Sequence, residues 1–376
     1  MRTIVLAWVA AGAMGLLALP AAVQATEPAA VCDRLAASPN DKNVAPGTGV
    51  GFFDIDAVPA VAACEASVAD SPDDVRQLYQ LGRAYDAAEQ YDKAMATYSA
   101  AADKGYALAT SSVGALYDLG LGVEADPVKA AGLYQEAVDA GVVVAMENLG
   151  KMYEEGRGVA QDYGRAKALY QQAANAGSTY ASGALGWMSE SGFGGPQDDV
   201  AARKLYQIAA DGGEAFAQHN LGVMYEDGRG GLSQDIAEAL RYFNLAAAQK
   251  WPPAYLSLSY AYGEGRGVPK DIARAEELLR RGIQEGDERT KGDAQNDLAW
   301  LLATENTRLD EAEKLSREAV AADPENANRL DTLAWVLHQS GRDAEALPLA
   351  EKAVALDAEA TSFAEHLAAI KAKLKT

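Results

Sequence analysis

The sequence predicts an all-α protein whose helices stack as a regular series of pairs. Alanine-rich blocks with helical periodicity run through most of the 376 residues, and runs of Val and Ile, which strands favour, are scarce. The middle of the chain also repeats itself at spacings of 36, 36, 36 and 37 residues, a period typical of helical solenoids. With 49% hydrophobic residues, the chain is far too apolar to be disordered.

Residues 1–25 have the pattern of a secretory signal peptide. Arg2 supplies a positive charge, residues 4–19 form a continuous apolar segment, and Pro20 ends it. Small residues then predict cleavage after Ala25. An uncleaved membrane anchor is the alternative, but the apolar run is shorter than the roughly 20 residues that a spanning helix needs. We therefore expect a soluble protein that the Sec pathway exports to the periplasm, or secretes fully, with no membrane insertion after cleavage.

The charge of the chain excludes one class of partner. It carries 33 Lys and Arg against 54 Asp and Glu, a net charge of −21. Such a surface repels nucleic acids and anionic lipid head groups. We expect no nucleic-acid partner, whereas basic partners and cations remain compatible. The simpler interpretation is that the charges cover the outer faces of helices and keep the protein soluble.

Residues 26–73 are predicted to form a separate N-terminal segment. They contain the two cysteines of the chain, Cys32 and Cys64, and an isolated pair in an oxidising compartment forms a disulfide. Residues 38–52 are rich in Pro, Gly and Asn and predict a loop, while residues 56–69 predict a helix. The disulfide would join this helix to a short helix around Cys32, and we expect it to contribute roughly 2–4 kcal/mol.

Residues 106–286 contain five copies of one pattern. Each copy has a small residue, two glycines as G-x-G, an aspartate, an alanine four residues later, and an aromatic residue or leucine four residues after that. The small residues are Gly114, Gly150, Gly186, Gly222 and Ser259, the first glycines are Gly120, Gly156, Gly192, Gly228 and Gly265, the aspartates are Asp126, Asp162, Asp198, Asp235 and Asp271, and the last residues are Tyr134, Tyr170, Tyr206, Phe243 and Leu279.

Each of these positions has a mechanical role in a pair of helices. The small residue lets the second helix approach the first closely. The G-x-G ends the first helix because glycine accepts positive φ, and the aspartate caps the second helix by accepting from its free amides. The loop EEGRGVAQD, residues 154–162, is therefore interpreted as a helix–loop–helix turn. A loop that binds a phosphate or a cation would seldom recur in every copy.

This pattern resembles the Sel1-like repeat, a relative of the tetratricopeptide repeat, found in bacterial secreted and periplasmic proteins. The resemblance implies a right-handed α-solenoid superhelix of helical pairs. Residues 74–105 resemble one tetratricopeptide repeat, and residues 287–376 resemble two more followed by a capping helix at residues 362–375.

No catalytic pattern emerges from the sequence. The motifs G-x-S-x-G, H-E-x-x-H and C-x-x-C are absent, and the three histidines, His219, His338 and His366, are scattered. We expect no catalytic residue, no metal site and no cofactor. Three arginines recur within the turns, Arg157, Arg229 and Arg266, and they are interpreted either as consensus residues or as a basic row for an acidic partner.

The expected function is partner binding in the groove that the first helices of such a solenoid line. Candidate groove residues are polar or aromatic residues outside the consensus: Ser111, Glu147, Asn148, Trp187, His219, Asn220 and Tyr255. Trp187 stands where sister repeats have smaller residues, and aromatic anchors often dominate interfaces. The alternative is that it fills a gap left by Ser189, which replaces the tyrosine of other repeats.

Three functions follow as hypotheses. The resemblance implies a non-enzymatic periplasmic scaffold, adaptor or regulator that binds proteins or peptides. A module that binds peptidoglycan or polysaccharide is the first alternative. The second is an enzyme that binds or hydrolyses β-lactams, as associated with cysteine-rich Sel1-like proteins. That subgroup has a disulfide in every repeat, whereas residues 106–286 have no cysteine.

Overall fold

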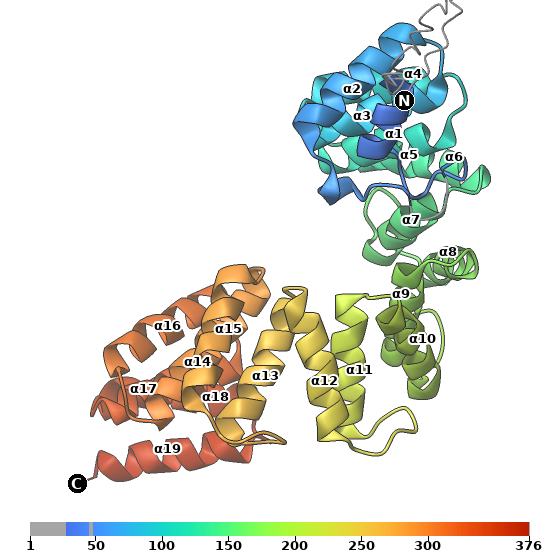
Figure 1. The fold of residues 1–376 in the computed structure, drawn as a ribbon. Coiled ribbons are helices and arrows are strands. Elements are labelled where there is room, and N and C mark those ends of the chain that lie inside the picture. The colour runs from blue at the N-terminus through green and yellow to red at the C-terminus, as the bar shows by residue number, and fades with distance from the viewer. Residues whose placement is uncertain (1–27, 45–47, 376) are drawn as a thin grey trace, which may run out of the picture. The chain divides into compact units, whose positions relative to one another are not determined.

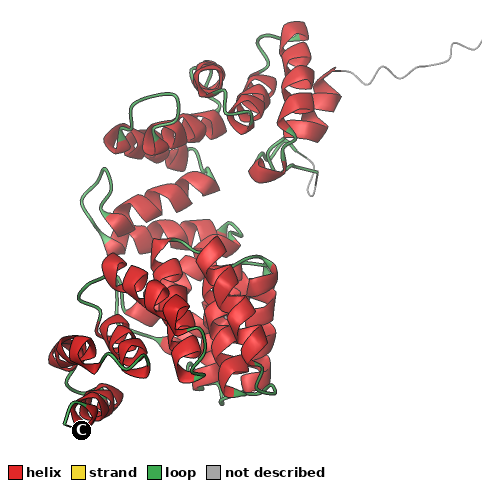
Figure 2. Cartoon of the chain, turned by 90° about the vertical axis from the view of Figure 1, so that its left-hand side faces the viewer, coloured by secondary structure: helices red, strands yellow, loops and turns green. Residues whose placement is uncertain are grey.

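The computed structural model describes residues 28–44 and 48–375, and this part of the chain consists of helices joined by loops and turns (Figures 1 and 2). It contains nineteen α-helices and one short 3-10 helix, with no strand among the described residues. The predicted all-α class is confirmed. The predicted signal peptide, residues 1–25, lies outside the described residues.

The chain divides into two compact units, one up to Val142 and the other from Val143 onward. The helices of the first unit are α1 Pro28–Ala36, η1 Phe52–Asp54, α2 Ala57–Asp70, α3 Val75–Ala87, α4 Tyr91–Ala102, α5 Ala107–Leu119 and α6 Pro127–Asp139. The helices of the second unit are α7 Val143–Glu155, α8 Tyr163–Asn175, α9 Thr179–Ser191, α10 Asp199–Asp211, α11 Ala215–Asp227, α12 Ile236–Ala248, α13 Pro252–Glu264, α14 Ile272–Glu285, α15 Glu288–Thr304, α16 Leu309–Ala322, α17 Ala327–Gln339, α18 Asp343–Leu356 and α19 Thr361–Lys373.

Within each unit, consecutive helices pack as antiparallel pairs, and each pair packs on the next, as α9, α10 and α11 do (Figure 1). Such a stack of helical pairs is a solenoid. Near the C-terminus the first helices also contact one another in order, α13 with α15, α15 with α17, and α17 with α19. These four helices therefore share one face, on which side chains about 35 residues apart in sequence become neighbours.

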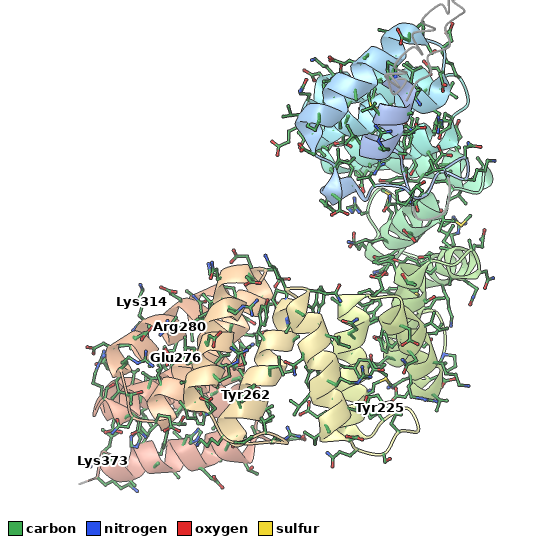
Figure 3. The ribbon with its side chains drawn as sticks, viewed as in Figure 1. Tyr225, Tyr262, Glu276, Arg280, Lys314 and Lys373 are labelled. Carbon is green, nitrogen blue, oxygen red and sulfur yellow. A yellow bond between two sulfur atoms is a disulfide. The ribbon has the colours of Figure 1, made fainter. Side chains whose placement is uncertain are left out.

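The predicted turn is confirmed in all five repeats. Both glycines of each G-x-G have positive φ; in the third repeat Gly192 has φ 73° and Gly194 has φ 69°. Each aspartate then caps the following helix, accepting from the amide three residues on, at Lys129, Arg165, Ala201, Glu238 and Arg274. The carbonyls of Tyr225 and Tyr262, labelled in Figure 3, accept from the amides of Asp235 and Asp271 at 2.9 and 2.8 Å. The EEGRGVAQD loop is thus a structural turn.

The small residues serve close packing, as predicted. A Cβ atom built on Gly150 would lie 2.9 Å from Cε1 of Tyr170, and one on Gly186 would lie 2.8 Å from Cδ1 of Tyr206. Both tyrosines are completely buried against these glycines. In the fifth repeat Ser259 replaces the glycine, and its counterpart on the second helix is Leu279 instead of an aromatic ring. A larger residue on the first helix thus coincides with a smaller one on the second.

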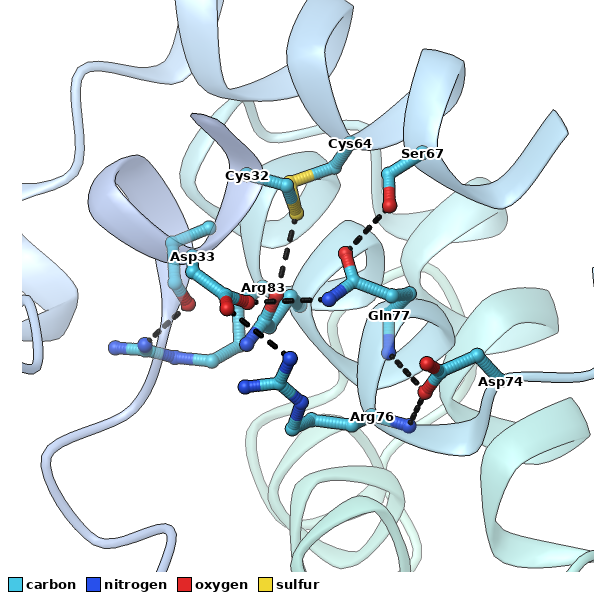
Figure 4. Close-up of a disulfide and its surroundings, with 10 residues drawn as sticks. Cys32, Asp33, Cys64, Ser67, Asp74, Arg76, Gln77 and Arg83 are labelled. Carbon is cyan, nitrogen blue, oxygen red and sulfur yellow. Dashed lines mark hydrogen bonds and ion pairs between the residues drawn. A yellow bond between two sulfur atoms is a disulfide. The ribbon is translucent and has the colours of Figure 1, made fainter. Parts of the chain in front are cut away.

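The N-terminal segment is joined by the predicted disulfide between Cys32 on α1 and Cys64 on α2, which is fully buried (Figure 4). Polar contacts attach this pair to α3. Asp33 accepts from Arg76 Nη2 at 3.0 Å and from Gln77 Nε2 at 3.1 Å, while Arg83 donates to the carbonyl of Ala36 at 2.6 Å. The segment is therefore folded onto helix α3.

Charged side chains on the second helices form networks across repeats. Glu276 and Arg280 lie one turn apart on α14 (Figure 3), with Arg280 Nε donating to Glu276 at 2.9 Å. Arg280 also reaches Glu311 on α16 at 2.7 Å, and Arg308 pairs with Glu276. Because these groups are partly exposed, each pair contributes little by itself, and the network mainly keeps this surface polar.

Candidate protein-interaction surface

Two of the predicted groove residues are corrected by their burial. Tyr255 is completely buried, and its hydroxyl donates to Glu285 at 2.7 Å and accepts from Arg281 at 2.6 Å. Ser111 retains only 3% exposure. Both side chains lie between packed helices and offer no surface to a partner, because their position in the repeat faces the neighbouring helix instead of solvent.

The other five candidates are half-buried on first helices. Glu147 and Asn148 lie on α7, and the Ser178 hydroxyl donates to Glu147 Oε1 at 2.5 Å. Burial raises the pKa of the Glu147 carboxyl, while the bond from Ser178 opposes the rise. A half-buried carboxylate with one hydroxyl donor keeps acceptor capacity for an incoming group.

Trp187 on α9 and His219 on α11 both make internal contacts. The ring centroid of Trp187 lies 4.9 Å from that of Phe193, in the turn of its own repeat. His219 Nε2 lies 3.1 Å from the hydroxyl of Ser257, and its Nδ1 lies 3.4 Å from Oδ1 of Asn220. Burial lowers the pKa of His219, while the bond with Asn220 opposes the fall. These two candidates sit on different repeats, and both are partly engaged in packing.

Two of the three recurring arginines of the turns bind acidic residues of the preceding repeat. Arg229 Nη2 lies 2.7 Å from Glu190, and Arg266 Nη1 lies 2.9 Å from Glu226. These half-buried pairs join consecutive turns. A basic row for an acidic partner is therefore not supported at Arg229 and Arg266, because their charges are already matched.

A hollow of about 550 Å³ lies over the first helices near the C-terminus, and the sequence analysis did not anticipate it. Its lining comes from α13, α15, the start of α17 and α19: Leu256, Asp293, Asn296, Asp297, Trp300, Asn326, Asn328, Arg329, Asp331, Thr332, Ser362, Phe363 and His366. A second hollow of about 230 Å³ adjoins it, because Asp297 and Trp300 line both. We call the two together the C-terminal hollow.

The charged side chains in this hollow make few hydrogen bonds or ion pairs. Arg329, with 5% exposure, donates to the carbonyl of Ala319 at 3.0 Å and to Asp293 Oδ1 at 2.8 Å. Asp331, with 4% exposure, has its Oδ2 2.7 Å from Nδ1 of His366. Burial raises the pKa of Asp297 to about 6, and a 3.4 Å hydrogen bond from Asn296 opposes the rise only weakly.

Three buried polar atoms in the lining have no hydrogen-bond partner: Oδ1 of Asn296, Nε of Arg329 and Oδ1 of Asp331. They are half of the six such side-chain atoms among the described residues. Folded proteins pair nearly all buried polar groups, so a concentration at one place needs an explanation. A bound ligand would supply the missing partners.

Aromatic rings border the same region. The His366 ring lies 5.4 Å from Trp300 and 4.4 Å from Trp335, and His338 lies 5.0 Å from Trp335, between ring centroids. Two of the three histidines that look scattered in the sequence thus meet around Trp335. A sequence signal was present: Leu-Ala-Trp occurs at residues 298–300 and again at 333–335, each with an aspartate three or four residues before the tryptophan.

The described residues give no sign of a metal centre or a membrane span. No group of three or more His, Cys, Asp or Glu side chains in this part of the chain could hold a metal ion. None of its helices is long and apolar enough to cross a bilayer.

Comparison with protein families identifies the repeats. The family model described as Sel1 repeat matches five segments, residues 107–142, 143–178, 180–214, 215–250 and 252–287. These segments coincide with the five copies recognised in the sequence. No curated protein sequence matches the chain significantly.

Solved structures with similar folds include two bacterial repeat proteins. One is c5321 of uropathogenic Escherichia coli, a protective antigen with an SLR fold, at 25% identity and a TM-score of 0.60, covering 81% of this chain and 67% of that one. Another is a Sel1 repeat protein from Oxalobacter formigenes, at 25% identity and a TM-score of 0.58, covering 64% and 96%. The APC/C hetero-tetramer Cut9-Hcn1, at 13% identity and a TM-score of 0.56 over 85% and 61%, shares the fold alone.

Proposed function

We propose that this Sel1-repeat protein of the tetratricopeptide superfamily is a non-enzymatic scaffold or adaptor of the periplasm that binds other proteins along the first helices of its repeats. Sel1 and tetratricopeptide repeats generally mediate protein–protein interactions, which supports the binding role. The signal-peptide pattern of residues 1–25 supports the compartment. The disulfide between Cys32 and Cys64 agrees with an oxidising environment.

One observation carries the proposal: the C-terminal hollow holds half of the described side-chain polar atoms that are buried without a partner. It lies on the shared face of α13, α15, α17 and α19, where a stack of helical pairs offers a continuous surface to an extended ligand. Glu147, Asn148, Trp187, His219 and Asn220 remain candidates for further contacts on the preceding first helices.

Site-specific photo-crosslinking in cells tests the proposal. The crosslinking amino acid replaces Asn328 or Ser362, which are exposed and line the C-terminal hollow, or Lys314, which is exposed on the second helix α16. We expect a discrete crosslinked partner from the first two positions and none from Lys314. No crosslink from any position, or the same crosslinks from all three, would refute partner binding on this face.

The same cells test the compartment. Fractionation should recover the protein in the periplasm, and N-terminal sequencing of the mature chain should begin at Thr26. Recovery of the chain with an intact N-terminus in the cytoplasm would contradict the proposed location.

Binding of a polysaccharide is the second candidate, and one observation favours it. Trp300 lines the hollow beside the carboxylate of Asp297 and the amide of Asn296, and a sugar ring can lie on an aromatic face while polar groups bond its hydroxyls. Retention of the protein on isolated sacculi, lost in Trp300→Ala, would favour this function over the scaffold.

A further inference from the structure

We infer that the C-terminal hollow binds a basic side chain, arginine in particular, presented by an extended segment of a partner protein. The inference rests on the proposed scaffold function and specifies the chemistry of its partner. It is carried by four features of the hollow: its charge, its unpaired polar atoms, its aromatic wall and its division into two adjoining parts.

The charge of the hollow is negative after internal pairing. Asp293, Asp297 and Asp331 line its larger part and Glu264 lines its smaller part, against one permanent cation, Arg329. Arg329 is already committed, because it donates to Asp293 and to the carbonyl of Ala319. Asp297 and Asp331 therefore remain, the first with a hydrogen bond from Asn296 and the second with His366 as its partner. These carboxylates would repel an anionic ligand and attract a cationic one.

The polar atoms without hydrogen-bond partners would be satisfied by a ligand with several N–H donors and one carbonyl acceptor. Oδ1 of Asn296 and Oδ1 of Asp331 are acceptors without a donor, and Nε of Arg329 is a donor without an acceptor. A guanidinium offers five N–H groups in a planar fork. The main-chain carbonyl of a peptide would satisfy Arg329. An arginine residue within a peptide combines both requirements, whereas a free metal ion supplies no donor.

The aromatic wall also suits a planar cation. Trp300 lines both parts of the hollow. A guanidinium held against an indole face gains electrostatic attraction from the ring and stacks flat on it. The protein uses this contact internally, since Cζ of Arg281 lies 4.3 Å from the ring centroid of Tyr255 and Cζ of Arg241 lies 4.0 Å from that of Tyr242.

The division of the hollow favours an extended segment over a single small amine. The larger part lies over α15, α17 and α19, and the smaller part continues toward α13, where Tyr260 and Glu264 line it. Tyr260 is 56% exposed, although large aromatic side chains are usually buried. A peptide that crosses from one part to the other would place neighbouring residues beside the carboxylates of both parts and would cover the ring of Tyr260.

Calorimetric titration of the purified full chain tests the inference with matched peptides. The probe is the acetylated and amidated peptide Gly-Arg-Gly-Arg-Gly, and its control has citrulline, the neutral analogue of the same shape, in place of arginine. We expect the arginine peptide to bind at least tenfold more tightly than the citrulline peptide. We also expect it to bind more tightly than arginine amide, which has the same cation without the flanking peptide.

Three variants locate the binding. Asp297→Asn and Trp300→Phe should each weaken the arginine peptide about tenfold, while Asp310→Asn, which removes the same charge from an exposed position on α16, should leave the affinity within twofold. Asp297→Asn keeps the shape of the side chain, so its circular dichroism spectrum should match that of the original protein. Trp300→Phe serves as the second variant if Asp297→Asn does not fold.

The outcomes separate this inference from the proposed function. If the citrulline peptide binds as tightly as the arginine peptide, the positive charge is not recognised and the inference is wrong. If Asp310→Asn weakens binding as much as Asp297→Asn, the attraction comes from the overall charge of the protein and not from the hollow, which would also overturn the inference. Tighter binding of a chitin hexasaccharide than of the arginine peptide would also overturn it and assign the hollow to sugars. If the crosslinked partner at Asn328 persists in Asp297→Asn, the scaffold function stands and only the basic ligand is wrong.

Discussion

The contact between Gly222 and Phe243 offers a direct test of how the repeats pack. Gly222 lies on the first helix α11, and the completely buried ring of Phe243 lies on its partner α12. A Cβ atom on Gly222 would lie 2.7 Å from Cε1 and 2.8 Å from Cδ1 of that ring. We therefore predict that Gly222→Ala lowers the free energy of unfolding, although alanine by itself is the better helix former.

The magnitude follows from two opposing effects. Alanine in place of glycine inside a helix gains roughly 0.5–1 kcal/mol. Forcing an extra methyl group into a packed core costs roughly 1–3 kcal/mol, so the clash should win by about 1–2 kcal/mol. Phe243→Leu by itself should cost roughly 1–2 kcal/mol through lost burial and a small cavity. The natural pair Ser259 and Leu279 indicates that a smaller partner accommodates the extra atoms.

Urea unfolding of the two single variants and the double variant measures the coupling. We expect the double variant to be about as stable as Phe243→Leu, which gives a coupling of roughly 1–2 kcal/mol between neighbours. Gly263→Ala is the control, because its Cβ would lie an ordinary 3.9 Å from Cβ of Ala275, and it should not destabilise. Strictly additive losses in the double variant would refute the proposed clash.

Three further predictions concern the turns, the disulfide and pH. Asp162→Ala removes the acceptor 3.0 Å from the amide of Arg165 and should cost about 1 kcal/mol, whereas Asp162→Asn, which keeps a capping oxygen, should cost much less in the same urea titration. Cys64→Ser should destabilise the first unit by roughly 2–4 kcal/mol, and reductant should lower the melting temperature of the original protein but leave that of the variant unchanged. Since the pKa of Asp297 is raised from 3.8 to about 6, its contribution to stability is present below pH 4 and is lost as the pH rises through 6. Asp297→Asn should therefore be more stable than the original protein by roughly 1–3 kcal/mol at pH 7 and lose that advantage near pH 4. Thermal melts at both pH values, with Asp310→Asn as the control, measure this difference. The same pH dependence in both variants would contradict the prediction.

The sequence predicted the elements that depend on local interactions. A left-handed glycine ends a helix and an aspartate caps the next one through contacts within a few residues, so a pattern such as Gly156-x-Gly158 followed by Asp162 specifies the turn wherever it occurs. The disulfide was predictable for a different reason, because Cys32 and Cys64 have no competing partners.

Only the tertiary structure decided which side chains are available to a partner. Tyr255 and Ser111 look like groove residues in the sequence, yet packing between helices buries them. The C-terminal hollow depends on α13, α15, α17 and α19 lying side by side, which brings Trp300, Asp331 and His366 together from three helices. The repeat period places such residues on one face, but whether their charges are paired or left open depends on distances between helices that the local sequence does not specify.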